Sequence, residues 1–140
     1  MRMIDRWIAE ATACDFKVAL EVKKPKSWLK SVSAFANGIG GTLFFGIDDD
    51  RNVVGLSDAQ TDAETISRLM KERITPYPSF VLAPARENGK DILVLSVSAG
   101  HATPYYYKAD GIMEAYIRIG NESVIAPSYV LNQLILKGMH

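Results

Sequence analysis

The sequence is poor in the residues and patterns that mark several classes of protein. Cys14 is the one cysteine among 140 residues, which excludes an internal disulfide and a zinc site built from several cysteines. The two histidines, His101 and His140, have no partner at the spacing of a metal site or a catalytic triad. No hydrophobic run is long enough to span a membrane, and the first residues do not resemble a signal peptide. We therefore expect a cytoplasmic protein without a membrane partner.

The chain also lacks an excess of positive or negative charge. Lys and Arg together number 16, as do Asp and Glu, which argues against a strongly basic protein that coats nucleic acid. The charges are unevenly distributed, because lysines gather between residues 17 and 30 and acids between residues 48 and 64. This distribution fits a basic patch that aligns a polyanion or a second subunit. It also fits an ordinary solvated surface, which charge alone favours.

The residues that are present predict one domain over residues 1–140. Alternating apolar residues predict a half-buried strand over Asp15–Lys23, and the apolar run Thr42–Ile47 predicts a strand covered on both faces. Between them, an apolar stripe at helical spacing predicts a helix with Ser27 as its N-cap. We expect this helix to end at Asn37-Gly38, residues that tolerate the left-handed conformation.

Further elements follow along the chain. Helices are expected over residues 1–13, over residues 61–74 and from Pro127 to about Lys137. Strands are expected over residues 53–56, 79–85, 90–98 and 114–119, with a hairpin turn at Asn88-Gly89. Together these elements predict an α+β fold, in which helices pack against a mixed sheet of about six strands.

Four short motifs of this chain occur in the same order in a known family. They are Glu21-Val22-Lys23, Ala34-Phe35-Ala36-Asn37, Gly40-Gly41-Thr42-Leu43 and Gly46-Ile47-Asp48-Asp49, and Pro104-Tyr105 and Tyr116-Ile117-Arg118-Ile119-Gly120 extend the match. Over about residues 15–130 the chain therefore resembles the Schlafen-type AlbA domain, also called the divergent AlbA domain and regarded as DNA-binding. The resemblance implies a nucleic-acid-binding domain, phosphate-directed and weakly sequence-specific, of the kind found in transcriptional regulators. It also implies a homo-oligomer, because family ribonucleases pair two such lobes around an RNA-sized groove.

Two other functions stay open. One is a divalent-metal endoribonuclease, for which the resemblance implies that Glu21 and Asp48 hold Mg²⁺ or Mn²⁺ while Lys23 positions water or stabilises charge. A further family glutamate is missing, since its position holds Phe16 and the nearest acid, Asp15, is displaced by one. For Glu21 an ion pair with a neighbouring lysine is the favoured alternative. The other function is a protein-interaction or oligomerisation domain.

The candidate nucleic-acid contacts are basic side chains around a strand-to-helix junction, where they can straddle phosphates without reading bases: Lys23, Lys24, Lys26 and Lys30. Arg118, whose family counterpart is an arginine, is a further candidate, with a structural salt bridge as its alternative. Tyr105-Tyr106-Tyr107 could stack on bases, although we favour tyrosines on an edge strand. ATP binding is not expected, because the chain has no P-loop and Gly38–Gly41 follows a helix C-terminus, where the dipole disfavours phosphate.

Overall fold

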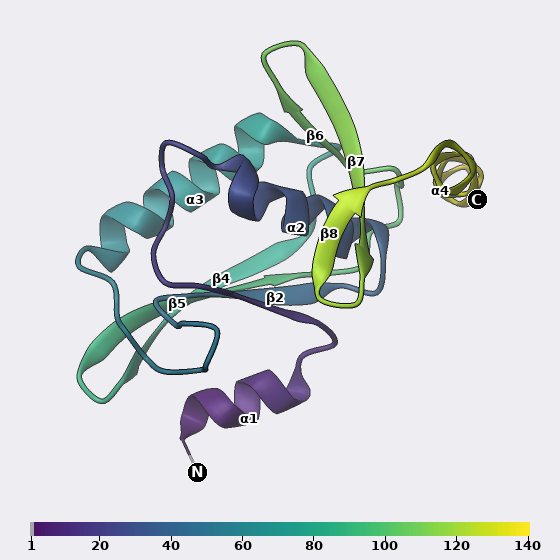
Figure 1. Cartoon of the computed structure of the whole chain (residues 1–140). Coiled ribbons are helices and arrows are strands. Elements are labelled where there is room, and N and C mark those ends of the chain that lie inside the picture. The colour runs from purple at the N-terminus through teal and green to yellow at the C-terminus, as the bar shows by residue number, and fades with distance from the viewer. Residues whose placement is uncertain (1) are drawn as a thin grey trace.

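A computed structural model describes residues 2–140, and it confirms the α+β fold (Figure 1). The first of its sheets has the strand order β1 (Cys14–Lys17), β2 (Gly41–Phe45), β5 (Lys90–Val97) and β4 (Phe80–Glu87). β1 runs parallel to β2, whereas β2–β5 and β5–β4 are antiparallel pairs. This sheet is therefore mixed, as the sequence predicts, and the hairpin turn predicted at Asn88-Gly89 joins its last two strands with positive φ at both residues.

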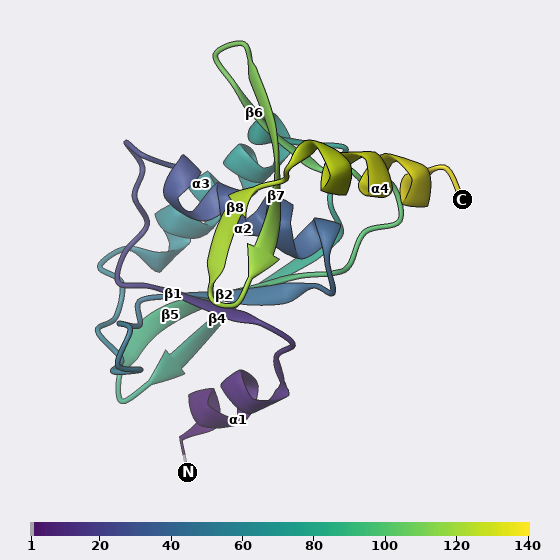
Figure 2. The same ribbon diagram turned by 45° about the vertical axis from the view of Figure 1, so that its right-hand side comes forward.

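The remaining strands form a second sheet of four, so the prediction of one sheet with about six strands is wrong in its layout. Its order is β3 (Ile74–Thr75), β6 (Tyr106–Ala109), β7 (Ile112–Ile119) and β8 (Glu122–Ile125). Helix α2 (Lys26–Asn37) packs between the two sheets (Figures 1 and 2), and nine of its twelve residues are buried. A helix that is apolar around most of its circumference needs cover on every side, and a single sheet cannot provide it.

The other helices occupy the outer layers. α3 (Ala59–Arg73) packs on the same face of the first sheet as α2, and its Ile66, Leu69 and Met70 are buried, as predicted. α1 (Met3–Glu10) covers the opposite face, where Ile4 and Ile8 pack with Phe44. α4 (Ser128–Gly138) lies at the periphery (Figure 2). Between residues 2 and 140 no helix is both long and apolar enough to cross a membrane.

The strand predicted over Asp15–Lys23 is wrong in its length, because β1 stops at Lys17. Gly46 directly follows β2 and has a φ of 99°, which turns the backbone after β2 away from β1. The Lys17 carbonyl accepts the last hydrogen bonds, from the backbone N–H groups of Gly46 and Ile47 at 2.7 and 3.2 Å. Residues 18–25 therefore leave the sheet as a loop, and Glu21 and Lys23 lie on this loop and not on a strand.

Three local predictions also need correction. The N-cap of α2 is Pro25 and not Ser27. The left-handed residue after α2 is Gly40, with a φ of 86°, whereas Gly38 has a φ of −117°. A side chain at position 40 would press on the carbonyl of Val97, so glycine allows this turn to approach β5 closely. Residues 53–56 form no strand and make a single bridge to Ile47.

Candidate nucleic-acid interface

The structure brings four of the predicted nucleic-acid residues to one cavity of about 780 Å³, which we call the basic groove. Its cationic lining consists of Lys23, Lys24, Lys26, Lys30 and Arg73. The lysines come from the loop after β1 and from the first turns of α2, while Arg73 ends α3. Residues of β6, β7 and β8 form the facing wall. The groove therefore lies where the N-terminus of α2 meets the second sheet, and the positive end of the helix dipole adds to the charge of the lysines.

Lys26 forms an ion pair within the groove. Its Nζ lies 2.9 Å from a carboxylate oxygen of Glu114 and 5.9 Å from the centre of the Tyr107 ring. The hydrogen bond to Glu114 raises the pKa of Lys26, and the same bond lowers the pKa of Glu114. Burial raises the pKa of Tyr116, which donates its hydroxyl to the same carboxylate at 3.1 Å.

The remaining lysines keep their charge available. Within residues 2–140, Lys23, Lys24 and Lys30 make no ion pair, and the first two are exposed. The buried hydroxyl oxygen of Ser27 also lines the groove and has no hydrogen-bond partner in the part of the chain that the structure describes. Three ammonium groups without an ion-pair partner are donors that suit the oxygens of a phosphate.

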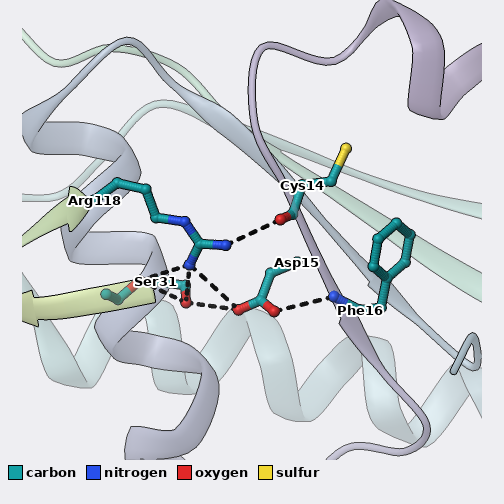
Figure 3. Close-up of polar contacts among 6 residues, drawn as sticks. Cys14, Asp15, Phe16, Ser31 and Arg118 are labelled. Carbon is teal, nitrogen blue, oxygen red and sulfur yellow. Dashed lines mark hydrogen bonds and ion pairs between the residues drawn. The ribbon is translucent and has the colours of Figure 1, made fainter. Parts of the chain in front are cut away.

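Arg118 joins four parts of the fold (Figure 3). Its guanidinium donates to the hydroxyl of Ser123 on β8 at 2.8 Å and to the carbonyl of Cys14 on β1 at 3.0 Å. The guanidinium also lies 3.7 Å from the carboxylate of Asp15 and 5.2 Å from the centre of the Phe35 ring on α2. We call this arrangement the Arg118 clasp, because it ties the first strand to the second sheet.

These contacts favour a structural salt bridge, and not a nucleic-acid contact, as the role of Arg118. The side chain is 12% exposed, and both of its terminal nitrogens already donate hydrogen bonds within the protein. It lies in a smaller cavity of about 360 Å³ that shares Lys30 and Ser123 with the basic groove. Arg118 is thus next to the groove rather than in it.

The two acids of the nuclease hypothesis, Glu21 and Asp48, lie on different loops. Glu21 is exposed on the loop after β1. Asp48 follows β2, where its Oδ1 accepts hydrogen bonds from the backbone N–H groups of Asn52 at 2.8 Å and Asp50 at 3.0 Å. The hydrogen bond from Asn52 is the main cause that lowers the pKa of Asp48. From residue 2 to residue 140, no group of three or more acidic, histidine or cysteine side chains is placed to hold a metal ion.

The three consecutive tyrosines do not form a stacking platform. Tyr105 and Tyr107 are each 5% exposed and belong to the core between α2 and the second sheet. Tyr106 is half-buried. Our preference for tyrosines on an edge strand is also wrong, since β6 lies between β3 and β7.

Sequence reasoning missed the polar residues that hold α2 against the second sheet. The side chain of Asn37 donates to the carbonyls of Tyr105 and Tyr116 at 3.0 and 2.9 Å and accepts from the Tyr105 N–H at 2.7 Å. Ser33, one turn earlier, donates to the Tyr105 carbonyl at 2.7 Å and accepts from the Tyr116 N–H at 3.0 Å. The signal was present in the sequence, because Ser33 and Asn37 are polar residues four apart on the apolar side of a helix.

Comparison with known proteins places the chain in a family. The model of the family described as "Schlafen, AlbA_2" matches residues 10–127. A solution structure of the N-terminal domain of a "Putative ATP-dependent DNA Helicase RecG-related Protein" from Nitrosomonas europaea is 27% identical. It superposes with a TM-score of 0.61 over 85% of this chain and 87% of that one.

A second solved structure shares the fold. The crystal structure of the DIP2311 protein from Corynebacterium diphtheriae has a TM-score of 0.57 and 20% sequence identity. The match covers 81% of this chain but 25% of that longer one. Since the family model spans most of the described residues, the protein belongs to the Schlafen AlbA_2 family.

Proposed function

We propose that this protein is a nucleic-acid-binding domain that contacts phosphates through the basic groove and reads sequence weakly. The observation that carries the proposal is the convergence of Lys23, Lys24, Lys26, Lys30 and Arg73 on one cavity, in a chain whose net charge is zero. Five of the 16 Lys and Arg residues line this cavity, against Asp110 as the acidic residue of the lining. Such an excess of cations creates a local positive potential, which steers and holds a polyanion.

The chemistry of the lining explains why sequence reading should be weak. Four of the five cations are lysines, and a lysine ammonium acts as a point charge rather than as a planar fork that matches a base edge. The fork of Arg73 points toward the hydroxyl of Tyr107 at 3.5 Å. Contacts with the phosphate backbone fix the position of a nucleic acid but carry no base information.

The comparisons support the same class of partner. The N. europaea protein is named for a relation to a DNA helicase, and its matched part is an N-terminal domain like the one described here. From the family we also propose a regulatory role of the transcriptional-regulator type and a cytoplasmic location.

The test is fluorescence anisotropy with labelled tRNA, single-stranded DNA and duplex DNA at increasing salt, with Mn²⁺ present. If Lys23, Lys24 and Lys30 neutralise about three phosphates, the logarithm of the binding constant should fall with the logarithm of salt with a slope of about −2 to −3. Lys24→Glu should weaken binding to every probe and make the slope shallower by about one. Lys137→Glu is the matched control, since Lys137 is exposed on α4 and outside the groove, and it should bind as the parent does.

Two results would overturn the proposal. One is no binding to any probe at low salt, which would leave a protein-interaction domain. The other is equal loss of affinity in the Lys24 and Lys137 variants, because it would mean that general charge rather than the groove attracts the probe. Gel analysis of the probes after binding tests the nuclease alternative, for which cleavage must depend on Mn²⁺ and disappear in Glu21→Ala.

A further inference from the structure

A second cavity adjoins the basic groove and differs from it in chemistry. It is the cavity of about 360 Å³ that contains Arg118, and we call it the side cavity. Residues of β1, α2, β7 and β8 line it. Lys30, Ser123 and Val124 line both cavities. A strand held in the groove therefore lies directly beside the side cavity.

One part of the side cavity's lining is already held by hydrogen bonds within the protein (Figure 3). Ser31 donates to one oxygen of the Asp15 carboxylate at 2.8 Å, and the backbone N–H of Phe16 donates to the other at 3.1 Å. Both terminal nitrogens of Arg118 donate within the Arg118 clasp. These groups give the cavity a fixed polar wall, so recognition of a ligand falls mainly on the other side chains.

The other part of the lining carries charged groups of both signs that do not pair with one another. Lys17 ends β1, Lys30 lies on α2 and Glu122 begins β8. Within residues 2–140 none of these three side chains makes an ion pair. The cavity thus offers a ligand two ammonium donors from β1 and α2 and a carboxylate acceptor from β8.

We infer that the side cavity binds an unpaired guanine of the strand whose phosphates lie in the basic groove. This inference rests on the proposed function. Guanine presents two neighbouring donors, N1–H and the N2 amino group, on one edge and two acceptors, O6 and N7, on another. The two oxygens of a carboxylate accept both donors, and ammonium groups donate to both acceptors. Each other base presents a single donor group on its pairing edge, so it can use the carboxylate of Glu122 only in part.

The guanine must be unpaired, because pairing with cytosine uses the same N1–H, amino group and O6 that the side cavity would contact. The cavity volume of about 360 Å³ lies within the range of pockets that hold small organic ligands, about 300–1,000 Å³. The lysines of the groove supply affinity without base information, and the side cavity adds a preference at one nucleotide. Sequence reading therefore stays weak over the whole site.

The experiment is fluorescence anisotropy with labelled oligothymidine DNA and oligouridine RNA strands that carry one central guanine, adenine or hypoxanthine, or none. The guanine strand should bind about tenfold tighter than the adenine strand or the strand without a purine. Hypoxanthine lacks the N2 amino group, so its strand should fall between them. A complementary strand that pairs the guanine should remove the preference.

Two variants locate the preference in the side cavity. Glu122→Gln replaces the carboxylate by an amide of the same shape, which has one acceptor oxygen, and should reduce the guanine preference to within about twofold. Its affinity for the strand without a purine should not fall, which shows that the variant is folded. Glu64→Gln is the matched control, because Glu64 is an exposed acid on α3 outside both cavities, and it should keep the full preference.

Free GMP, added as a competitor, distinguishes a guanine carried by a strand from a free nucleotide. GMP lacks the contacts along the groove, so it should compete at least about tenfold more weakly than the unlabelled guanine strand. Equal competition would assign the side cavity to a free nucleotide and overturn the inference.

The remaining outcomes separate this inference from the proposed function. Equal affinity for all the strands would overturn the guanine site and leave the binding groove standing. A preference that survives Glu122→Gln, or that Glu64→Gln abolishes equally, would overturn it by placing recognition elsewhere. No binding to any strand at low salt would overturn the proposed function and this inference with it.

Discussion

Replacement of Asn37 by alanine tests the proposed connection between α2 and the second sheet. The amide of Asn37 makes three hydrogen bonds to backbone groups of Tyr105 and Tyr116, and it is 5% exposed. Alanine fits the helix but takes away all three bonds. The Tyr105 carbonyl keeps its bond from Ser33, so the two groups that lose most are the Tyr105 N–H and the Tyr116 carbonyl.

The magnitude follows from those two groups. Each buried polar group left without its partner costs about 1–3 kcal/mol, so the free energy of unfolding should fall by about 3–4 kcal/mol. That is a large part of the stability of an ordinary domain, about 5–15 kcal/mol. For a chain of this length the melting temperature should drop by about 10 °C.

Urea unfolding followed by tryptophan fluorescence measures this loss, since Trp28 lies on α2 itself and is buried against Phe45. Gln133→Ala provides the control, because this amide is exposed on α4 and its loss should change stability by less than about 0.5 kcal/mol. A loss below about 1 kcal/mol for Asn37→Ala, with an unchanged fold, would refute the reasoning. It would mean that these hydrogen bonds add little beyond the packing of α2.

Two further predictions concern the charged pairs. Arg118→Lys should lower the free energy of unfolding by about 2 kcal/mol in the same urea assay, because an ammonium cannot replace the fork that reaches β1 and β8 together; equal stability would refute the clasp. Lys26→Met should raise the pKa of Glu114 toward its ordinary value of 4.5, as measured by NMR titration of the carboxyl carbon. Because Lys26 depresses that pKa in the folded state, the pair stabilises the fold above the unfolded pKa of Glu114, and this stabilisation is lost as pH falls through the folded pKa. A Glu114 pKa that does not move in Lys26→Met would show that the pair has no electrostatic effect.

Local patterns predicted much of the fold, because the responsible forces act within a few residues. The apolar stripe of α2, the inward residues of α3 and the turn at Asn88-Gly89 are all readable from spacing or from backbone preference. The end of β1 cannot be read in this way, since Val18 and Val22 continue the alternating pattern. The pairing ends only because the segment after β2 turns away at Gly46. For the same reason, periodicity identified strands without indicating which of them share a sheet.

In the candidate site, too, some residues were predictable from the sequence and others were not. The lysines of the groove lie close together in the sequence, so their clustering was visible before the fold was known. Arg73 joins them from the end of α3 and could be found only in three dimensions. Arg118 matched a family arginine, but its burial depends on contacts with β1 and α2 that sequence separation conceals.

The Arg118 clasp has a consequence for synthesis of the chain on the ribosome. The hydrogen bond from Arg118 to the Cys14 carbonyl spans 104 positions of the sequence. β1 and α2 are thus made early, but the second sheet that covers α2 is completed only after β8 emerges. Since domains fold as units during synthesis, the apolar surface of α2 stays open for most of translation. A ribosome that stalls before residue 118 therefore presents a nascent chain suited to capture by chaperones.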